Sequence, residues 1–325
     1  MANRVKVPPN IFGMPFALTG LAGVWRTAQS YGISPAGVTD ALLILAAFVW
    51  LLTCVLYFSR PRDVRADLVD NIGQPFIALA AIVPMLCAYQ GLEPRAHTAA
   101  VVVVDVFLVL TVLYGGWITG QWIYAPVDAP KIHPGYFLPT VAGGLIASAA
   151  ATSVGQRRLG EFMFGFGVIC WFVMGSIIMN RLFISPLLPP PLIPTLAIEV
   201  APAPVASIAY FALNGGRIDT VAAFIAGYGV LIFVAQFRFL PAYLRLKFSP
   251  GFWSFGFAFA TAATVTLVWI NVGRPSPHFA LSWLVIGLIT LLIGGIALRT
   301  LVAVARGTYL PRPTPPPVTG TASPR

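Results

Sequence analysis

Few residues of this sequence could do chemistry, and their spacing does not assemble a reaction centre. The three histidines are scattered over expected loops, without the paired spacing that a zinc site or a catalytic triad needs: His97, His133 and His278. The three cysteines lie in apolar stretches and form no CxxC pair: Cys54, Cys87 and Cys170. The sequence therefore indicates no enzyme, no metal site and no cofactor.

Two acidic residues, Glu199 and Asp105, fall inside apolar stretches, where an ionised carboxylate is costly and is generally paired, protonated or functional. Two interpretations of Glu199 stay open. It is either tucked between helices, hydrogen-bonded or paired with an arginine, or it is a proton-linked or gating group. We interpret Asp105 as an inter-helix hydrogen-bonding residue.

The composition places these residues in a membrane. Only 9% of the 325 residues are charged and 58% are hydrophobic, whereas soluble domains carry about 25% charged residues. The net charge of +10 is spread over loops and span ends, which is typical of membrane topology and gives no reason to expect a nucleic-acid partner. We predict an all-α integral membrane protein whose main partner is the lipid bilayer.

The apolar stretches predict ten spans, with a tail at residues 1–10, a membrane domain at 11–305 and a disordered Pro-rich tail at 306–325. The expected spans are Ile11 to Ala28, Asp40 to Phe58, Pro75 to Gln90, Thr98 to Trp117, Tyr136 to Ala151, Glu161 to Asn180, Thr195 to Leu213, Thr220 to Leu240, Phe252 to Val272 and Ala280 to Val304.

The basic residues orient the spans, because cytoplasmic loops are enriched in Lys and Arg. With both termini cytoplasmic, fourteen of the 20 Lys and Arg residues lie inside. The other six lie outside: Arg26, Arg95, Arg157, Arg158, Arg217 and Arg274. We therefore expect both termini in the cytoplasm.

Proline separates the odd spans from the even ones. Interior or near-interior prolines occur in the first, third, fifth and seventh spans: Pro15, Pro84, Pro139, Pro202 and Pro204. No expected even span contains one. A proline frees backbone carbonyls that hydrocarbon cannot satisfy, so kinked helices belong inside a bundle or beside a wet cavity. The pattern predicts an inner ring of odd helices around a pore and an outer ring of even helices.

The stretch GFWSFGFAFATAAT, residues 251–264, sets the ninth span apart. It places bulky aromatic rings among Gly, Ala, Ser and Thr, which favours a pore wall with an obstruction. The alternative is that these rings face lipid or pack between helices, as membrane aromatics commonly do.

Several segments, in order along the chain, resemble the tellurite-resistance/dicarboxylate transporter family, which includes bacterial TehA, fungal malate permeases and the slow anion channels of plant guard cells. They are IFGMPFALTGLAGVW, HPGYFLPTVAG, APAPVASIAY, GRIDTVAAFIAGYGVL and FWSFGFAFA. The resemblance implies five helical hairpins around a central pore, a homotrimer in the cell (inner) membrane, and passage of small anions such as chloride, nitrate, carboxylates or oxyanions, with tellurite resistance attached to the bacterial branch.

The family also implies that a phenylalanine of the ninth helix occludes the pore. The matching position is Phe257, with Phe255 as its rival, because two residues turn a helix by about 200°. The residues expected to line the pore are Gly13, Pro15, Pro84, Pro139, Pro202 and Pro204. Glu199 and Asp105 depart from the family, so a proton-coupled exporter of C4-dicarboxylates or oxyanions stays open, as does a non-transporting scaffold.

Overall fold

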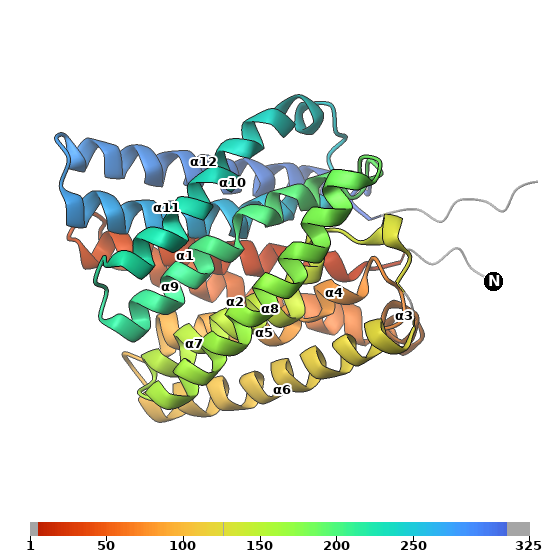
Figure 1. Ribbon diagram of the computed structural model, residues 1–325, viewed down its shortest axis with the longest axis horizontal. Coiled ribbons are helices and arrows are strands. Elements are labelled where there is room, and N and C mark those ends of the chain that lie inside the picture. The colour runs from red at the N-terminus through yellow and green to blue at the C-terminus, as the bar shows by residue number, and fades with distance from the viewer. Residues whose placement is uncertain (1–5, 126, 311–325) are drawn as a thin grey trace, which may run out of the picture.

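The computed structural model describes residues 6–125 and 127–310, and every regular element in them is helical (Figure 1). The expected tail at 306–325 falls almost wholly outside these residues. The helices are α1 (Gly13–Ser30), α2 (Val38–Phe58), α3 (Pro61–Asp67), α4 (Gln74–Ile77), α5 (Leu79–Cys87), α6 (His97–Tyr124), α7 (Gly143–Ser153), α8 (Arg157–Ile184), α9 (Pro202–Asn214), α10 (Thr220–Leu244), α11 (Trp253–Gly273) and α12 (His278–Ala305).

Nine helical stretches of the described chain are long and apolar enough to cross a membrane. Together they make the chain a multi-pass membrane protein. They correspond to the second to tenth expected spans. The first expected span coincides with α1, which has 18 residues and is less apolar, because Arg26, Gln29 and Ser30 stand near its end.

The nine stretches fall into two classes by burial. The third, fifth, seventh and ninth expected spans correspond to Gln74–Leu92, Pro134–Ser153, Ile193–Asn214 and Pro250–Gly273, and between 56% and 94% of each is buried. The other five are only 17% to 28% buried. We call the four buried stretches and α1, most of whose residues are also buried, the inner helices, and the rest the outer helices.

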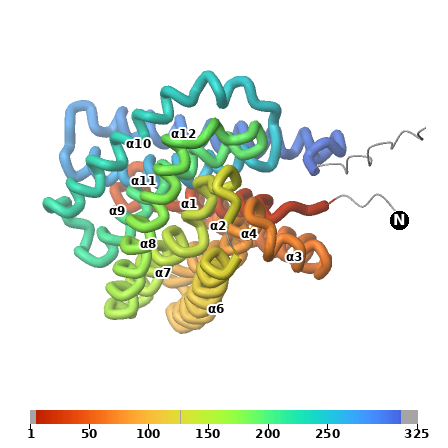
Figure 2. Tube along the Cα trace, turned by 45° about the vertical axis from the view of Figure 1, so that its right-hand side comes forward, coloured from red at the N-terminus to blue at the C-terminus, as the bar shows by residue number. Residues whose placement is uncertain are grey.

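The outer helices lie around the inner ones. In two views of the bundle, α6 and α12 lie on opposite sides, with α1 between them (Figures 1 and 2). The outer helices expose rows of large apolar side chains, such as Ile44, Phe48 and Leu51 on α2. Such a surface is the one expected to face lipid.

Three of the five inner helices are interrupted near the expected prolines, whereas α1 runs unbroken past Pro15. Wide π turns occupy Ala88–Leu92 and Leu138–Ala142, and a 3-10 stretch occupies Ile193–Val200. Pro84 lies inside α5, and the carbonyl of Ala80, one turn earlier, accepts a hydrogen bond of 2.9 Å from the indole of Trp50 on α2. An outer helix thus satisfies the carbonyl that the proline leaves free.

The prediction that even spans lack proline is wrong at one point. The eighth span was expected to end at Leu240, but α10 continues through Pro241 to Leu244. Pro241 stands in the last turn of the helix, where a proline disturbs the helix less than it would at the centre of a span.

Small residues bring α1 and α11 close together. A Cβ atom on Gly256 would lie 2.3 Å from the Cβ of Ala17, and one on Gly20 would lie 3.0 Å from both Ala260 and Phe257. Gly144 and Gly167 bring α7 and α8 together in the same way. Small residues commonly serve close helix packing in membranes.

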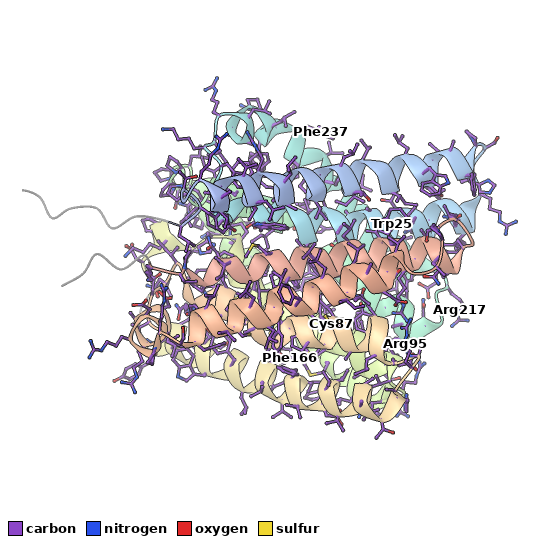
Figure 3. All side chains as sticks on the ribbon, turned by 180° about the vertical axis from the view of Figure 1, so that it is seen from behind. Trp25, Cys87, Arg95, Phe166, Arg217 and Phe237 are labelled. Carbon is purple, nitrogen blue, oxygen red and sulfur yellow. The ribbon has the colours of Figure 1, made fainter. Side chains whose placement is uncertain are left out.

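The two ends of the bundle differ. At one end lie α3 and residues 6–12, where Lys6 pairs with the buried carboxylate of Asp67. We call this end the amino-terminal face. Arg95 and Arg217 both lie at the other end, which we call the opposite face (Figure 3).

Candidate functional site

Two cavities lie along the axis of the bundle, and side chains of all five inner helices line each of them. The first has a volume of about 40 Å³ and lies toward the amino-terminal face. Its lining is mostly apolar, with Leu79, Val141 and Val205 among its residues, and we call it the apolar cavity. The second has a volume of about 130 Å³, lies toward the opposite face and includes Arg26 and Gln90, and we call it the polar cavity.

Phe257 lies at the boundary between the cavities and, with Leu145 and Val205, lines both. Its ring stacks on that of Phe16, with centroids 3.5 Å apart and planes at 16°. Both rings are at most 5% exposed. The stacked pair is therefore an apolar obstruction at the junction of two cavities.

Local sequence explains how Phe257 reaches this position. It lies one residue after Gly256, which lets α11 touch α1, and its ring fits against Gly20, where a side chain would collide with it. The carbonyl of Phe257 accepts a hydrogen bond of 3.1 Å from the hydroxyl of Thr261, one turn later. Small residues on both helices thus make the room that one large ring fills.

Phe255, the rival position, points elsewhere. Its ring meets Tyr243 of α10 edge-on, with centroids 4.8 Å apart, and it lines a groove bounded by α10 and α12. Phe252 and Phe259 line the same groove. These three rings pack between helices, as membrane aromatics commonly do, and Phe257 alone of the four faces the two central cavities.

The residues expected to line the pore divide into two groups. Gly13 and Pro202 line the apolar cavity. Pro15 and Pro139 are buried but are absent from the lining of both cavities. Pro84 and Pro204 instead line grooves on the outer side of the inner helices, so the prediction that they face the centre is wrong. Pro84 lies on the side of the inner helix that packs against α2, where Trp50 donates to the carbonyl of Ala80.

Glu199 is buried, at 6% exposure, at the end of the 3-10 stretch before α9, and it lines neither central cavity. It lies close enough to Tyr228 and Tyr243 of α10 to interact with them electrostatically. Its Oε1 has no hydrogen-bond partner, and no Lys or Arg in the described part of the chain lies within ion-pair distance. The structure thus gives no support for arginine pairing and turns the carboxylate away from the central axis.

Asp105 on α6 was expected to hydrogen-bond between helices. Its Oδ1 is buried and has no partner among the described residues. The expected inter-helix bond of this atom is therefore missing. The acids that open the second and sixth expected spans do find partners, since Asp40 pairs with Arg95 and Glu161 with Arg158.

His133 directly precedes the inner stretch Pro134–Ser153 and is fully buried. Its Nε2 donates to the carbonyl of Ile72 at 3.2 Å, and its Nδ1 accepts the N–H of Gly135 at 3.1 Å. Burial lowers the pKa of His133 to about 4, because desolvation disfavours the imidazolium. The ring is therefore neutral at neutral pH and ties two loops together near the amino-terminal face.

Sequence reasoning missed Phe16 and the polar group formed by Arg26, Tyr89 and Gln90. The motif around Phe16 was noticed, but nothing in the spacing links it to Phe257 on a distant segment. Arg26 was counted only as an outer-loop charge. The sequence did contain a signal for this polar group, because Arg26 and the polar residues after it make α1 the least apolar of the long helices.

Comparison with protein families matches residues 6–301 to the family described as voltage-dependent anion channel. The tellurite resistance protein TehA homolog of Haemophilus influenzae is 29% identical over 262 residues, 79% of each chain. The guard cell S-type anion channel SLAC1 of Arabidopsis thaliana is 24% identical over 86% of this chain, and S-type anion channel SLAH3 of the same plant is 23% identical over 92%. This chain spans about half the length of the two plant proteins, 52% and 48%.

Proposed function

The chain belongs to the voltage-dependent anion channel family, and on this premise we propose that its ten helices form a pore for small anions, closed by Phe257. One observation carries the proposal. Both central cavities are lined by all five inner helices, and Phe257 stands between them, stacked on Phe16. The helices then form five hairpins, each pairing an inner helix with the outer helix that follows it.

The closed state rests on size and on wetting. Two stacked aromatic rings fill the junction, and the apolar cavity beside them offers few groups that could replace the water around an ion. An apolar constriction of this kind resists hydrated ions because water withdraws from it. Conduction requires the ring of Phe257 to leave Phe16 and turn into one of the cavities, which lie on both sides of it.

The charges favour anions over cations. The one charged residue that lines either central cavity, within the described chain, is Arg26. Glu199 lies off the axis, so its charge does not line the path. A cation at the mouth of a low-dielectric cavity raises the local concentration of anions. Chloride, nitrate and small carboxylates fit this field, and an oxyanion such as tellurite is included because a relative is named for tellurite resistance.

The distribution of basic residues also supports a proposal for the membrane orientation of the pore. We place the protein in the cell membrane with the amino-terminal face in the cytoplasm, where most of the basic residues then lie. We expect a homotrimer with one pore in each subunit and no enzymatic activity, cofactor or metal.

Anion flux into liposomes that contain purified protein tests the proposal. Chloride and nitrate should enter Phe257→Ala vesicles faster than wild-type vesicles, in response to membrane potential and without a pH gradient. Malate and tellurite, tested beside them, define the substrate range. Flux that needs a pH gradient would favour a proton-coupled exporter, and absence of flux in both proteins would favour a scaffold.

A further inference from the structure

We propose that the polar cavity holds a binding site for one small monovalent inorganic anion, formed by Arg26, Tyr89 and Gln90. The site rests on the proposed function, since it would lie on the path between the opposite face and Phe257. It adds a place where the anion stops before the obstruction. Three observations carry it, namely an unpartnered cation, a buried amide whose hydrogen-bonding groups are not all paired, and threonine hydroxyls near Phe257 that already donate to backbone carbonyls.

Arg26 is a cation without an anionic partner. No carboxylate in residues 6–125 and 127–310 forms an ion pair with it, and its contact is with the ring of Tyr89, whose centroid lies 5.7 Å from the guanidinium carbon. Two other arginines of the opposite face have acidic partners, Arg95 with Asp40 and Arg158 with Glu161. A half-buried guanidinium with all its N–H groups free is prepared to bind an anion.

Gln90 supplies a further donor beside it, and Tyr89 fixes the orientation of the Gln90 amide. The side-chain amide of Gln90 donates to the hydroxyl oxygen of Tyr89 at 3.4 Å, which leaves the hydroxyl proton of Tyr89 without an acceptor. Gln90 is 5% exposed, and its Oε1 is buried without a partner beside Gly23. Buried polar atoms are rarely left unpaired, so this space is expected to hold a hydrogen-bonding guest. A half-turn of the amide points its NH₂ group into this space and its oxygen at Tyr89, whose hydroxyl proton that oxygen then accepts. Gln90 therefore donates to the anion, and Tyr89 holds the amide in this orientation.

Three of the four threonines that line the cavity do not compete for the anion, because their hydroxyl protons are already donated. Thr19 donates its hydroxyl proton to the carbonyl of Phe16 at 2.8 Å, and Thr264 donates to that of Ala260 at 3.0 Å. Thr261 donates likewise to Ala258. These hydroxyls present only lone pairs to the cavity, so an anion is drawn away from Phe257 and toward Arg26.

The charge and size of the site define its ligand. A single guanidinium balances one negative charge, and no second Lys or Arg lines the cavity among the described residues. A dicarboxylate would keep one carboxylate uncompensated. The volume of about 130 Å³ accommodates an ion of the size of chloride or nitrate with some of its water. We therefore assign the site to monovalent halide or nitrate.

The test is chloride binding to the purified full-length protein in detergent, followed by the broadening of the chloride nuclear magnetic resonance line. Wild-type protein should show saturable broadening that nitrate displaces. Arg26→Gln should weaken chloride binding at least tenfold and Tyr89→Phe severalfold, whereas Arg26→Lys should keep most of it. Arg217→Gln is the matched control, because it removes the same charge from the same face outside the cavity. Unchanged binding in a folded Arg26→Gln protein, with wild-type melting temperature, would overturn the proposal.

Binding and conduction are read separately, so the two proposals can fail separately. The binding assay uses the closed wild-type protein and needs no current. Conductance is then measured in Phe257→Ala protein with and without Arg26→Gln. If chloride binding depends on Arg26 but Phe257→Ala carries no current, the anion site is supported and the pore is refuted. If the current depends on chloride concentration in the same way with and without Arg26→Gln, and the wild type shows no saturable chloride binding, the anion site is refuted while the pore is not.

Discussion

Replacing Phe16 by alanine should loosen the closed state of the pore, because it removes the surface on which Phe257 rests. The two rings lie 3.5 Å apart between centroids and are nearly parallel, at 16°. An aromatic pair contributes about 0.5–1.5 kcal/mol beyond simple burial. At about 1.36 kcal/mol for each factor of ten, Phe16→Ala should raise the anion current roughly two- to tenfold.

The structure also predicts how Phe16→Ala combines with Phe257→Ala. Once Phe257 is removed, Phe16 has no ring to hold, so the double variant should conduct about as well as Phe257→Ala alone. The measurement is anion current at equal surface amounts of protein for the wild type, both single variants and the double variant. Because deletion of a buried Phe costs about 3–5 kcal/mol, the melting temperature must be measured alongside. Independent, multiplicative effects of the two changes would refute the reasoning that the rings act as one obstruction.

Three further predictions follow from the contacts around the bundle. Glu199→Gln should give an anion current similar to or somewhat higher than that of the wild type, because the carboxylate lies outside both cavities. Complete loss of transport in folded Glu199→Gln protein would instead indicate that Glu199 is an obligatory proton carrier. The pKa of His133 is about 4 in the folded protein, below its unfolded value, so its contribution to stability is full above the unfolded pKa and falls as the pH drops toward 4. Acidification from pH 7 to 5 should therefore cost about 2 kcal/mol at this residue, and thermal melting of His133→Gln beside the wild type should show a smaller loss on acidification. Trp50→Phe should lower the free energy of unfolding by about 1 kcal/mol, because the Ala80 carbonyl loses its donor. In a Pro84→Ala background the loss should be smaller, because residue 84 then has a backbone N–H that can donate to Ala80. An equal loss in both backgrounds would show that the hydrogen bond is not the cause.

Much of the fold could be predicted from the sequence, because the position of a membrane helix depends on local apolar length and its kinks depend on local prolines. Apolar length located nine of the spans, and the kinks fell where proline removes a backbone donor, as at Pro84. The end of the eighth span was expected at Leu240, four residues too early, since the last turn of α10 contains Pro241. The first span stood out less, because α1 carries Arg26 and other polar residues near its end.

The site was less predictable because it depends on which way side chains turn. Phe257 and Phe255 differ by two residues, and only packing against α1 shows that the first faces the centre and the second faces α10. A proline marks a kink but not its direction, so Pro202 lines a central cavity and Pro204 does not. Phe16 could not be paired with Phe257 without the three-dimensional contact.

Anion current through single alanine variants of the inner stretch Pro250–Gly273 tests the central claim most directly. Phe257→Ala should join the two cavities and raise the current at least tenfold at equal surface expression, which corresponds to about 1.4 kcal/mol or more off the barrier. Phe255→Ala should leave the current near the wild-type level, because its ring packs on Tyr243 away from the axis. A closed Phe257→Ala beside an open Phe255→Ala, or two closed variants, would contradict the proposal that Phe257 closes the path between the cavities.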